Sequence, residues 1–183
     1  RLHASTGNIQ LQSSSKETAL NKITVQGGSV SAAKELVIYA DKDITLSNID
    51  FIKKANSSQA QVNSINAYAG NNLSFTTANQ EFPYTAGKIQ LDAGNQLRLE
   101  GKDQNSKLSG GGGLKLSGKN ISTKNIYMTG SGANGVDIIS DGGNILLDQG
   151  SRLWANTGDI NINALNGSIT ANSLQATTLG KAS

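Results

Sequence analysis

The chain has 183 residues, with 21 glycines and only 4% aromatic residues, which suits a narrow coil filled by Ile, Leu and Val better than a conventional sandwich core. Its formal net charge is +3 with scattered Lys and Arg, and no apolar run could cross a bilayer, so we expect no nucleic-acid binding and no membrane insertion. The absence of Cys excludes a disulfide framework or a thiolate metal site and fits an exported protein.

Strand-length apolar segments begin close to the N-terminus, at residues 9–11, 23–25, 36–39 and 44–46. Each alternates apolar and polar residues or is continuously apolar, and none has helical spacing. The chain starts at Arg1, without an initiator Met or an apolar leader. We therefore expect residues 1–183 to be a single β-helix fragment, internal to a longer protein.

The alternation is clearest at residues 142–171, where four short strands follow one another with only Gly, Asn, Asp, Ser and Thr between them. In each of them the apolar residues occupy positions i and i+2, so each strand can bury one face. The strands begin 7 to 9 residues apart, which leaves room for about five strand residues and a corner.

The same pattern recurs along the chain with a 24-residue period. The anchor column contains Val25, Ile49, Leu73, Leu97, Ile121, Ile145 and Ile169. A second column contains Ile65, Ile89, Leu114, Ile138 and Ile160, with spacings of 24, 25, 24 and 22 residues. Such self-similarity predicts a solenoid of parallel strands, in which each repeat buries its apolar face on its neighbours.

The corners of this solenoid have their own columns. Gly70, Gly94, Gly118 and Gly142 lie three residues before an anchor, where we expect a sharp turn with positive φ. Asn48, Asn72, Asn120 and Asn144 lie one residue before it; they either form a ladder in which each side-chain amide donates to the next coil, or tolerate a left-handed backbone. The run Gly110 to Gly113 is predicted to be a corner, because the period continues through it. Glu100, Lys124 and Asp148 should form a column of alternating charge.

Longer polar inserts at residues 53–63, 76–85, 100–107 and 124–134 follow the anchor strand in the same phase of the repeat. We expect them to collect along one edge, which is our candidate partner-contact edge. Its aromatic members are Phe82, Tyr84, Tyr127 and Trp154, and its cations are Lys53, Lys54, Lys102 and Lys107. Exposed aromatic rings would suit stacking on sugars or anchoring a protein; alternatively, the rings shield the side of the solenoid.

Catalytic and metal sites are not expected. Asp137, Asp141, Asp148 and Asp159 fall at different phases of the repeat, which scatters them around the coil instead of pairing an acid and a base. His3 is the only His and has no Ser or Cys partner at motif spacing. We therefore predict no catalytic residues, no cofactor and no metal.

Three runs carry a family resemblance: AGNQLRLEG at 93–101, SGKNISTKNI at 117–126, and SDGGNILLDQGSRLWANTGDININALNGSITA at 140–171. They resemble the haemagglutinin-type repeats of filamentous haemagglutinin and the related contact-dependent growth inhibition exoproteins, which are exported by two-partner secretion. The chain has no Asn-Pro element like that of their secretion domain, since its single Pro, Pro83, follows Phe82, and it has no Cys- or His-bearing toxin-like tail. The resemblance thus points to the middle of a fibre.

The resemblance implies a right-handed parallel β-helix, which at this period has about seven to eight coils. It implies a structural or adhesive segment of a large secreted bacterial surface protein, either an adhesin or a toxin carrier involved in virulence. Expected partners are a receptor or glycan on a host or neighbouring cell and, for the parent protein, an outer-membrane transporter. The alternative function is a carbohydrate-active β-helix enzyme of the pectin-lyase-like type, and a structural rival, the leucine-rich repeat, would need helical segments that are not visible.

Overall fold

The computed structural model describes residues 2–4, 6–13, 21–32, 34–51, 62–77, 81–85, 87–148, 150–172 and 174–178. Within these ranges the chain forms twenty β-strands and no helix. Every pairing between described strands is parallel. The predicted parallel β-solenoid is confirmed.

The strands lie on three faces of a rod. The first face carries β2 (Ile9–Ser13), β5 (Glu35–Ala40), β8 (Ser64–Ala69), β11 (Ile89–Glu100), β13 (Leu114–Lys124), β15 (Val136–Ser140) and β18 (Ile160–Ala164). The second face carries β3 (Lys22–Gln26), β6 (Asp43–Ser47), β9 (Asn72–Thr76), the C-terminal halves of β11 and β13, β16 (Ile145–Leu147) and β19 (Ile169–Ala171). Strands β11 and β13 therefore bend around the corner between these two faces.

The third face carries two sheets made of shorter strands. One contains β1 (Leu2–Ala4), β4 (Ser29–Ala32) and β7 (Asp50–Phe51). The other contains β10 (Glu81–Thr85), β12 (Lys107–Gly110), β14 (Tyr127–Gly130), β17 (Arg152–Ala155) and β20 (Gln175–Thr178).

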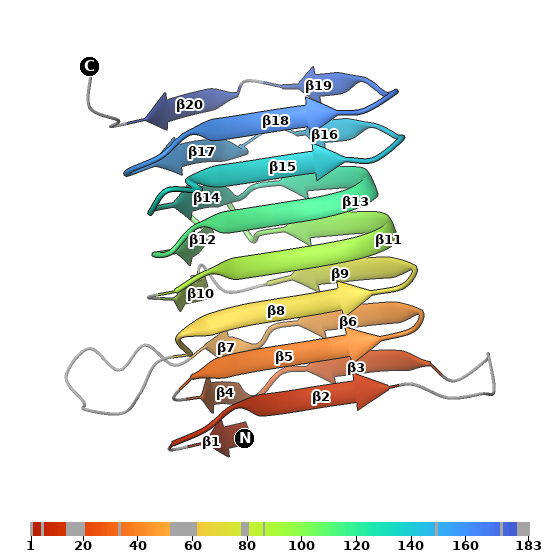
Figure 1. Cartoon of the computed structure of the whole chain (residues 1–183), viewed down its shortest axis with the longest axis vertical. Coiled ribbons are helices and arrows are strands. Elements are labelled where there is room, and N and C mark those ends of the chain that lie inside the picture. The colour runs from red at the N-terminus through yellow and green to blue at the C-terminus, as the bar shows by residue number, and fades with distance from the viewer. Residues whose placement is uncertain are drawn as a thin grey trace.

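The chain coils in a right-handed sense. In Figure 1 the strands of the first face run to the right, the chain returns behind them along the other two faces, and it climbs from the N-terminus to the C-terminus. Seven strands stand on the first face, so six full turns separate β2 from β18. The predicted seven to eight coils were slightly too many.

The 24-residue period holds from β9 onward, where Leu73, Leu97, Ile121, Ile145 and Ile169 are register partners. Nearer the N-terminus the predicted column was wrong, because the residues aligned with Leu73 are Ile44 and Ile23. The coil from Ile44 to Leu73 is therefore five residues longer than the period, and the coil from Ile23 to Ile44 is three residues shorter. The longer coil contains the link between β7 and β8, which has twelve residues against two between β4 and β5.

The second column also needs one correction. Val136, and not Ile138, is aligned with Leu114 and Ile160. Because the error is two residues, Ile138 still points inward and is fully buried.

The core consists of aliphatic columns that run the length of the rod. Each inward side chain stacks on its register partner about 4.8 Å away. Leu97, Leu99 and Ile145, for example, are completely buried. Each such side chain contributes roughly 1.5 to 3 kcal/mol, so the interior is filled by side chains and holds the coils together.

The corner glycines are needed for close approach between coils. Gly70, Gly94 and Gly118 do not have positive φ, contrary to the prediction, which is correct only for Gly142. A Cβ on Gly70 or Gly94 would lie 2.1 Å from a backbone carbonyl oxygen of the preceding coil. A side chain is therefore excluded by the spacing between coils. The corner predicted at 110–113 is confirmed, with Gly113 at φ 121° between β12 and β13.

The Asn ladder exists, but its polarity is the reverse of the one predicted. The Asn120 Oδ1 accepts from the Asn144 backbone N–H at 3.2 Å, and the Asn144 Oδ1 accepts from the Ser168 N–H at 3.0 Å. Asn72 also accepts through Oδ1, from the Asn95 side chain at 3.1 Å. The left-handed alternative applies only to Asn48, with φ 52°, which lies outside this column.

The third face was largely missed in the sequence. The stretches 76–85 and 124–134, predicted to be polar inserts, contain strands β10 and β14. These strands have only five and four residues, EFPYT and YMTG, so apolar alternation is too brief to identify them. The predicted insert 100–107 is the link before β12 and enters that strand only at Lys107, and most of the predicted insert 53–63 lies outside the described residues.

Candidate contact surface

The third face brings together most of the described residues that were predicted for partner contact. Lys107, Tyr127 and Arg152 are register partners on β12, β14 and β17 and form one outward column. Ser109, Thr129 and Trp154 are aligned in the next column on the same side of these strands, each two residues further on; Ser109 and Thr129 are buried, and Trp154 is partly exposed. We call these two columns the contact surface.

The first column is held by contacts of its two cations with Tyr127 and Gln104. The Lys107 Nζ lies 5.4 Å from the centre of the Tyr127 ring, which is within the range of a cation–π contact. Partial burial of the Tyr127 hydroxyl raises its pKa, although the positive charge of Arg152 acts in the opposite direction. Arg152 in turn donates a hydrogen bond of 3.1 Å to the Gln104 Oε1, which fixes the link between β11 and β12 against β17.

Hydrogen bonds also hold the second column. The Trp154 Nε1–H donates to the Asn156 Oδ1 at 2.6 Å, and the Asn156 amide donates to the Ser131 Oγ at 3.0 Å. Within this column the hydroxyl of Thr129 donates to that of Ser109 at 2.6 Å, and both of these residues are buried. The hydrogen bond to Asn156 thus fixes one edge of the Trp154 indole, and the residue is partly exposed.

A shallow depression of about 210 Å³ opens beside Trp154. It is lined by Tyr127, Arg152, Leu153, Trp154, Gln175 and Thr177. An aromatic wall, a guanidinium and amide or hydroxyl groups are the types of group that orient a polar ligand or anchor a protein loop.

The other predicted residues are placed less completely. Phe82 and Tyr84 belong to β10 on the same sheet, but their side chains lie outside what the structure describes. Tyr84, and not Phe82, is aligned with Ser109 and hence with the Trp154 column, because the register shifts within β10. Lys102 is exposed in the link before β12, whereas Lys53 and Lys54 lie outside the described residues.

Sequence reasoning missed Arg152, Gln175 and Gln104 as members of this surface. Arg152 could have been found, because it lies two residues before Trp154 on a strand that had been predicted, and so points to the same side. Nothing in the neighbouring sequence identifies Gln175 or Gln104. The position of Gln175 depends on the register between coils, and that of Gln104 depends on the path of the link between β11 and β12.

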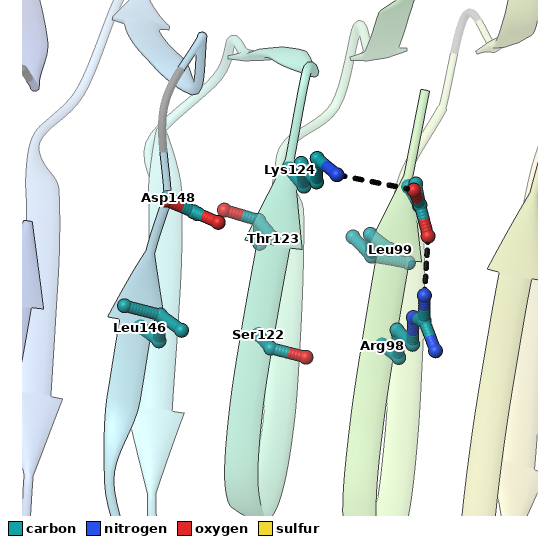
Figure 2. A pocket seen from close by; sticks show the side chains of 8 residues that line it. Arg98, Leu99, Ser122, Thr123, Lys124, Leu146 and Asp148 are labelled. Carbon is teal, nitrogen blue, oxygen red and sulfur yellow. Dashed lines mark hydrogen bonds and ion pairs between the residues drawn. The ribbon is translucent and has the colours of Figure 1, made fainter. Parts of the chain in front are cut away.

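A second depression, of about 150 Å³, lies on the second face and contains the predicted charge column (Figure 2). Lys124 and Glu100 are paired at 3.7 Å, and Glu100 also binds Arg98. Asp148, the next residue in the column, accepts a hydrogen bond of 3.1 Å from Asn172. The charge column is confirmed for Glu100 and Lys124, and since both side chains reach solvent it adds at most about 1 kcal/mol.

The carboxylates considered for catalysis are spread over different parts of the coil. Asp137 is on β15, Asp141 follows that strand at the corner, Asp148 follows β16 on the second face, and Asp159 precedes β18. His3 lies exposed on β1. Among the described residues, no group of three or more His, Cys, Asp or Glu side chains could hold a metal ion.

No helix in the described part of the chain is long and apolar enough to cross a membrane. Comparison of the chain with protein-family models, with curated proteins and with solved structures found no match.

Proposed function

We propose that this chain is a structural and adhesive β-helical segment of a large secreted bacterial surface protein. The segment acts by holding a binding surface at a distance from the cell that makes it. The observation that carries this proposal is the contact surface on the third face, where cation, aromatic and amide groups from successive coils form one continuous patch on a rigid rod.

The rod itself supports the structural half of the proposal. Its three faces recur from coil to coil, and the aliphatic columns run through all of them. A solenoid of this kind is stabilised by contacts between neighbouring coils and can be extended by adding further coils. The complete lack of Cys is consistent with export.

The surface chemistry supports the adhesive half. Tyr127 and Trp154 are the types of residue that dominate binding energy at protein contacts, and Arg152 beside them is the third such type. The scattered carboxylates weigh against the alternative of a carbohydrate-active enzyme, because acid and base must flank one bond. The expected partner is a receptor or glycan on a host or neighbouring cell, and the parent protein would need an outer-membrane transporter for its export.

The test is binding of the purified protein to target cells, repeated with a Trp154→Ala, Tyr127→Ala double variant. We expect the double variant to bind at least about tenfold more weakly, since each such truncation typically costs more than about 1 kcal/mol at an interface. Thermal melts must first show that the variant is folded.

Leu146→Ala is the matched control, because Leu146 is also an exposed large apolar residue but lies on the second face. Equal binding by the double variant and the control would remove the third face as the contact surface. If the unmodified protein binds no cells at all, the adhesive half of the proposal fails and the segment is a spacer.

A further inference from the structure

Two tyrosines stack on the first face, whereas the contact surface is on the third. Tyr39 on β5 and Tyr68 on β8 are register partners, their ring centres are 5.3 Å apart, and their planes differ by 13°. Tyr68 is 46% exposed, although it is a large aromatic residue. In Figure 1 these strands lie side by side on the face toward the viewer, with β11 next to β8.

The stack ends abruptly at the next coil. The register partner of Tyr68 on β11 is Asp92, and the partner of Asp92 on β13 is Ser117. Because Tyr39 covers one side of the Tyr68 ring, the other side faces the coil that carries Asp92. The shorter side chains leave a depression of about 160 Å³, which is lined by residues of β5, β8 and β11. The depression lies between the column of Tyr39, Tyr68 and Asp92 and the neighbouring outward column of Val37, Asn66 and Gln90.

Polar groups around this space are already held in place and have unused bonding capacity. Gln90 donates from Nε2 to the Asp92 Oδ2 at 2.7 Å, which leaves the Gln90 Oε1 and the Asp92 Oδ1 as acceptors without a partner among the described residues. Asn66, which also lines the space, is held by a hydrogen bond from its amide to Glu35. The Tyr39 hydroxyl is engaged by the Asp41 carboxylate, a contact that raises the pKa of Tyr39.

An exposed aromatic face with several acceptors at its side matches a pyranose ring. One face of a sugar carries C–H groups that pack on an aromatic ring, and its hydroxyls donate to carboxylate and amide oxygens. The charges restrict which sugar fits. Glu35, Asp41 and Asp92 place negative charge around the space, with Lys115 as the cation aligned with Gln90 on the next coil. An acidic sugar would be repelled.

We infer that Tyr68, Gln90 and Asp92 form a binding site for one uncharged pyranose residue of a glycan, which lies in this depression and packs against the exposed part of the Tyr68 ring. This inference deepens the proposed adhesive function, since it names a ligand class, but it assigns that ligand to a different face. A flat sheet surface with one exposed ring should bind single sugars weakly, in the millimolar range, about 4 kcal/mol.

The experiment is a titration of the purified protein with soluble sugars, followed by saturation-transfer NMR and calorimetry. The panel contains methyl glycosides of glucose, galactose and N-acetylglucosamine, together with methyl glucuronide as the acidic counterpart of the glucose compound. We expect saturable binding of at least one uncharged sugar and about two- to fivefold weaker binding of the glucuronide, because the carboxylates repel it through solvent.

Variants at two positions test the site from opposite directions. Tyr68→Ala removes the stacking surface and should weaken binding about tenfold, whereas Tyr68→Phe keeps the ring and should retain most of the affinity. Asp92→Tyr places a side chain in the space and should abolish binding in a protein that keeps its fold. Ile139→Ala is the matched control, because Ile139 points outward in the same column two coils beyond Asp92.

Lack of saturation by every sugar up to about 100 mM, well above a millimolar dissociation constant, overturns the inference. So does unchanged affinity in both Tyr68→Ala and Asp92→Tyr. Neither result affects the cell-binding test of Trp154 and Tyr127, so this site and the contact surface can fail separately.

Discussion

Replacing Ile121 by Asp should destroy the central coil, whereas Ser122→Asp should be tolerated. Ile121 is 1% exposed and lies between Leu97 and Ile145, both completely buried, as its register partners. A carboxylate there would have aliphatic side chains above and below it and no polar partner. Ser122 points outward between Arg98 and Leu146, where a new carboxylate can reach solvent and the guanidinium.

The expected difference is large compared with ordinary stability. An unpaired charge buried in this way costs several kcal/mol even after local relaxation, while domains of this size are stable by only about 5 to 15 kcal/mol. Because neighbouring coils stabilise one another, the loss should also separate the coils on either side. The milder Ile121→Ala should cost about 2 to 5 kcal/mol, and Ser122→Asp less than about 1 kcal/mol.

Denaturant unfolding followed by far-ultraviolet circular dichroism would measure all three variants. The expected order of stability is Ser122→Asp close to the unmodified protein, Ile121→Ala clearly lower, and Ile121→Asp without a cooperative transition. Equal losses for the inward and outward Asp variants would refute the register described here.

Two further predictions concern the corners and the pH dependence. Gly94→Ala should cost about 1 to 3 kcal/mol by overpacking, because its Cβ would lie 2.1 Å from a carbonyl oxygen, whereas Gly7→Ala, whose Cβ meets nothing within 4 Å, should leave the melting temperature nearly unchanged. Desolvation raises the pKa of Asp43, but hydrogen bonds from Lys22, Asn71 and the Asn72 backbone outweigh it and leave that pKa below its ordinary value. The stabilisation is therefore present above the unfolded pKa of about 3.9 and is lost as the pH falls through the lower folded pKa. Melts from pH 7 to pH 2 should show Asp43→Asn to be less stable at neutral pH and equal to the unmodified protein in acid; a constant difference would contradict this.

Much of the fold could be predicted because the core has to repeat. From Leu73 onward the residues that stack on the second face are 24 positions apart, so the inward column of that face can be found by counting. Counting fails before that point, because corners absorb insertions without disturbing the strands. The coil between Ile44 and Leu73 is five residues longer than the repeat. Ile49 lies 24 residues before Leu73 in the sequence, but the residue that stacks on Leu73 is Ile44.

The binding surfaces were harder to predict for the same reason. Tyr39 and Tyr68 are separated by this longer coil, so no search at the 24-residue period pairs them, and their stack depends on a register that only the structure supplies. Trp154 and Tyr127 were identified from residue type and phase alone. Arg152 was missed, although alternation along β17 places it beside Trp154.

The length of the rod depends on its number of turns and hardly at all on its number of residues. Each coil advances by one strand spacing, about 4.8 Å, so a 24-residue coil gains about 0.2 Å per residue, against 1.5 Å in an α-helix. The six turns from β2 to β18 span about 29 Å. Bending the rod would require many hydrogen bonds between strands of the same face to lengthen together. The rod is therefore stiff. A corner can therefore lengthen, as the link between β7 and β8 has done, without changing the length of the rod.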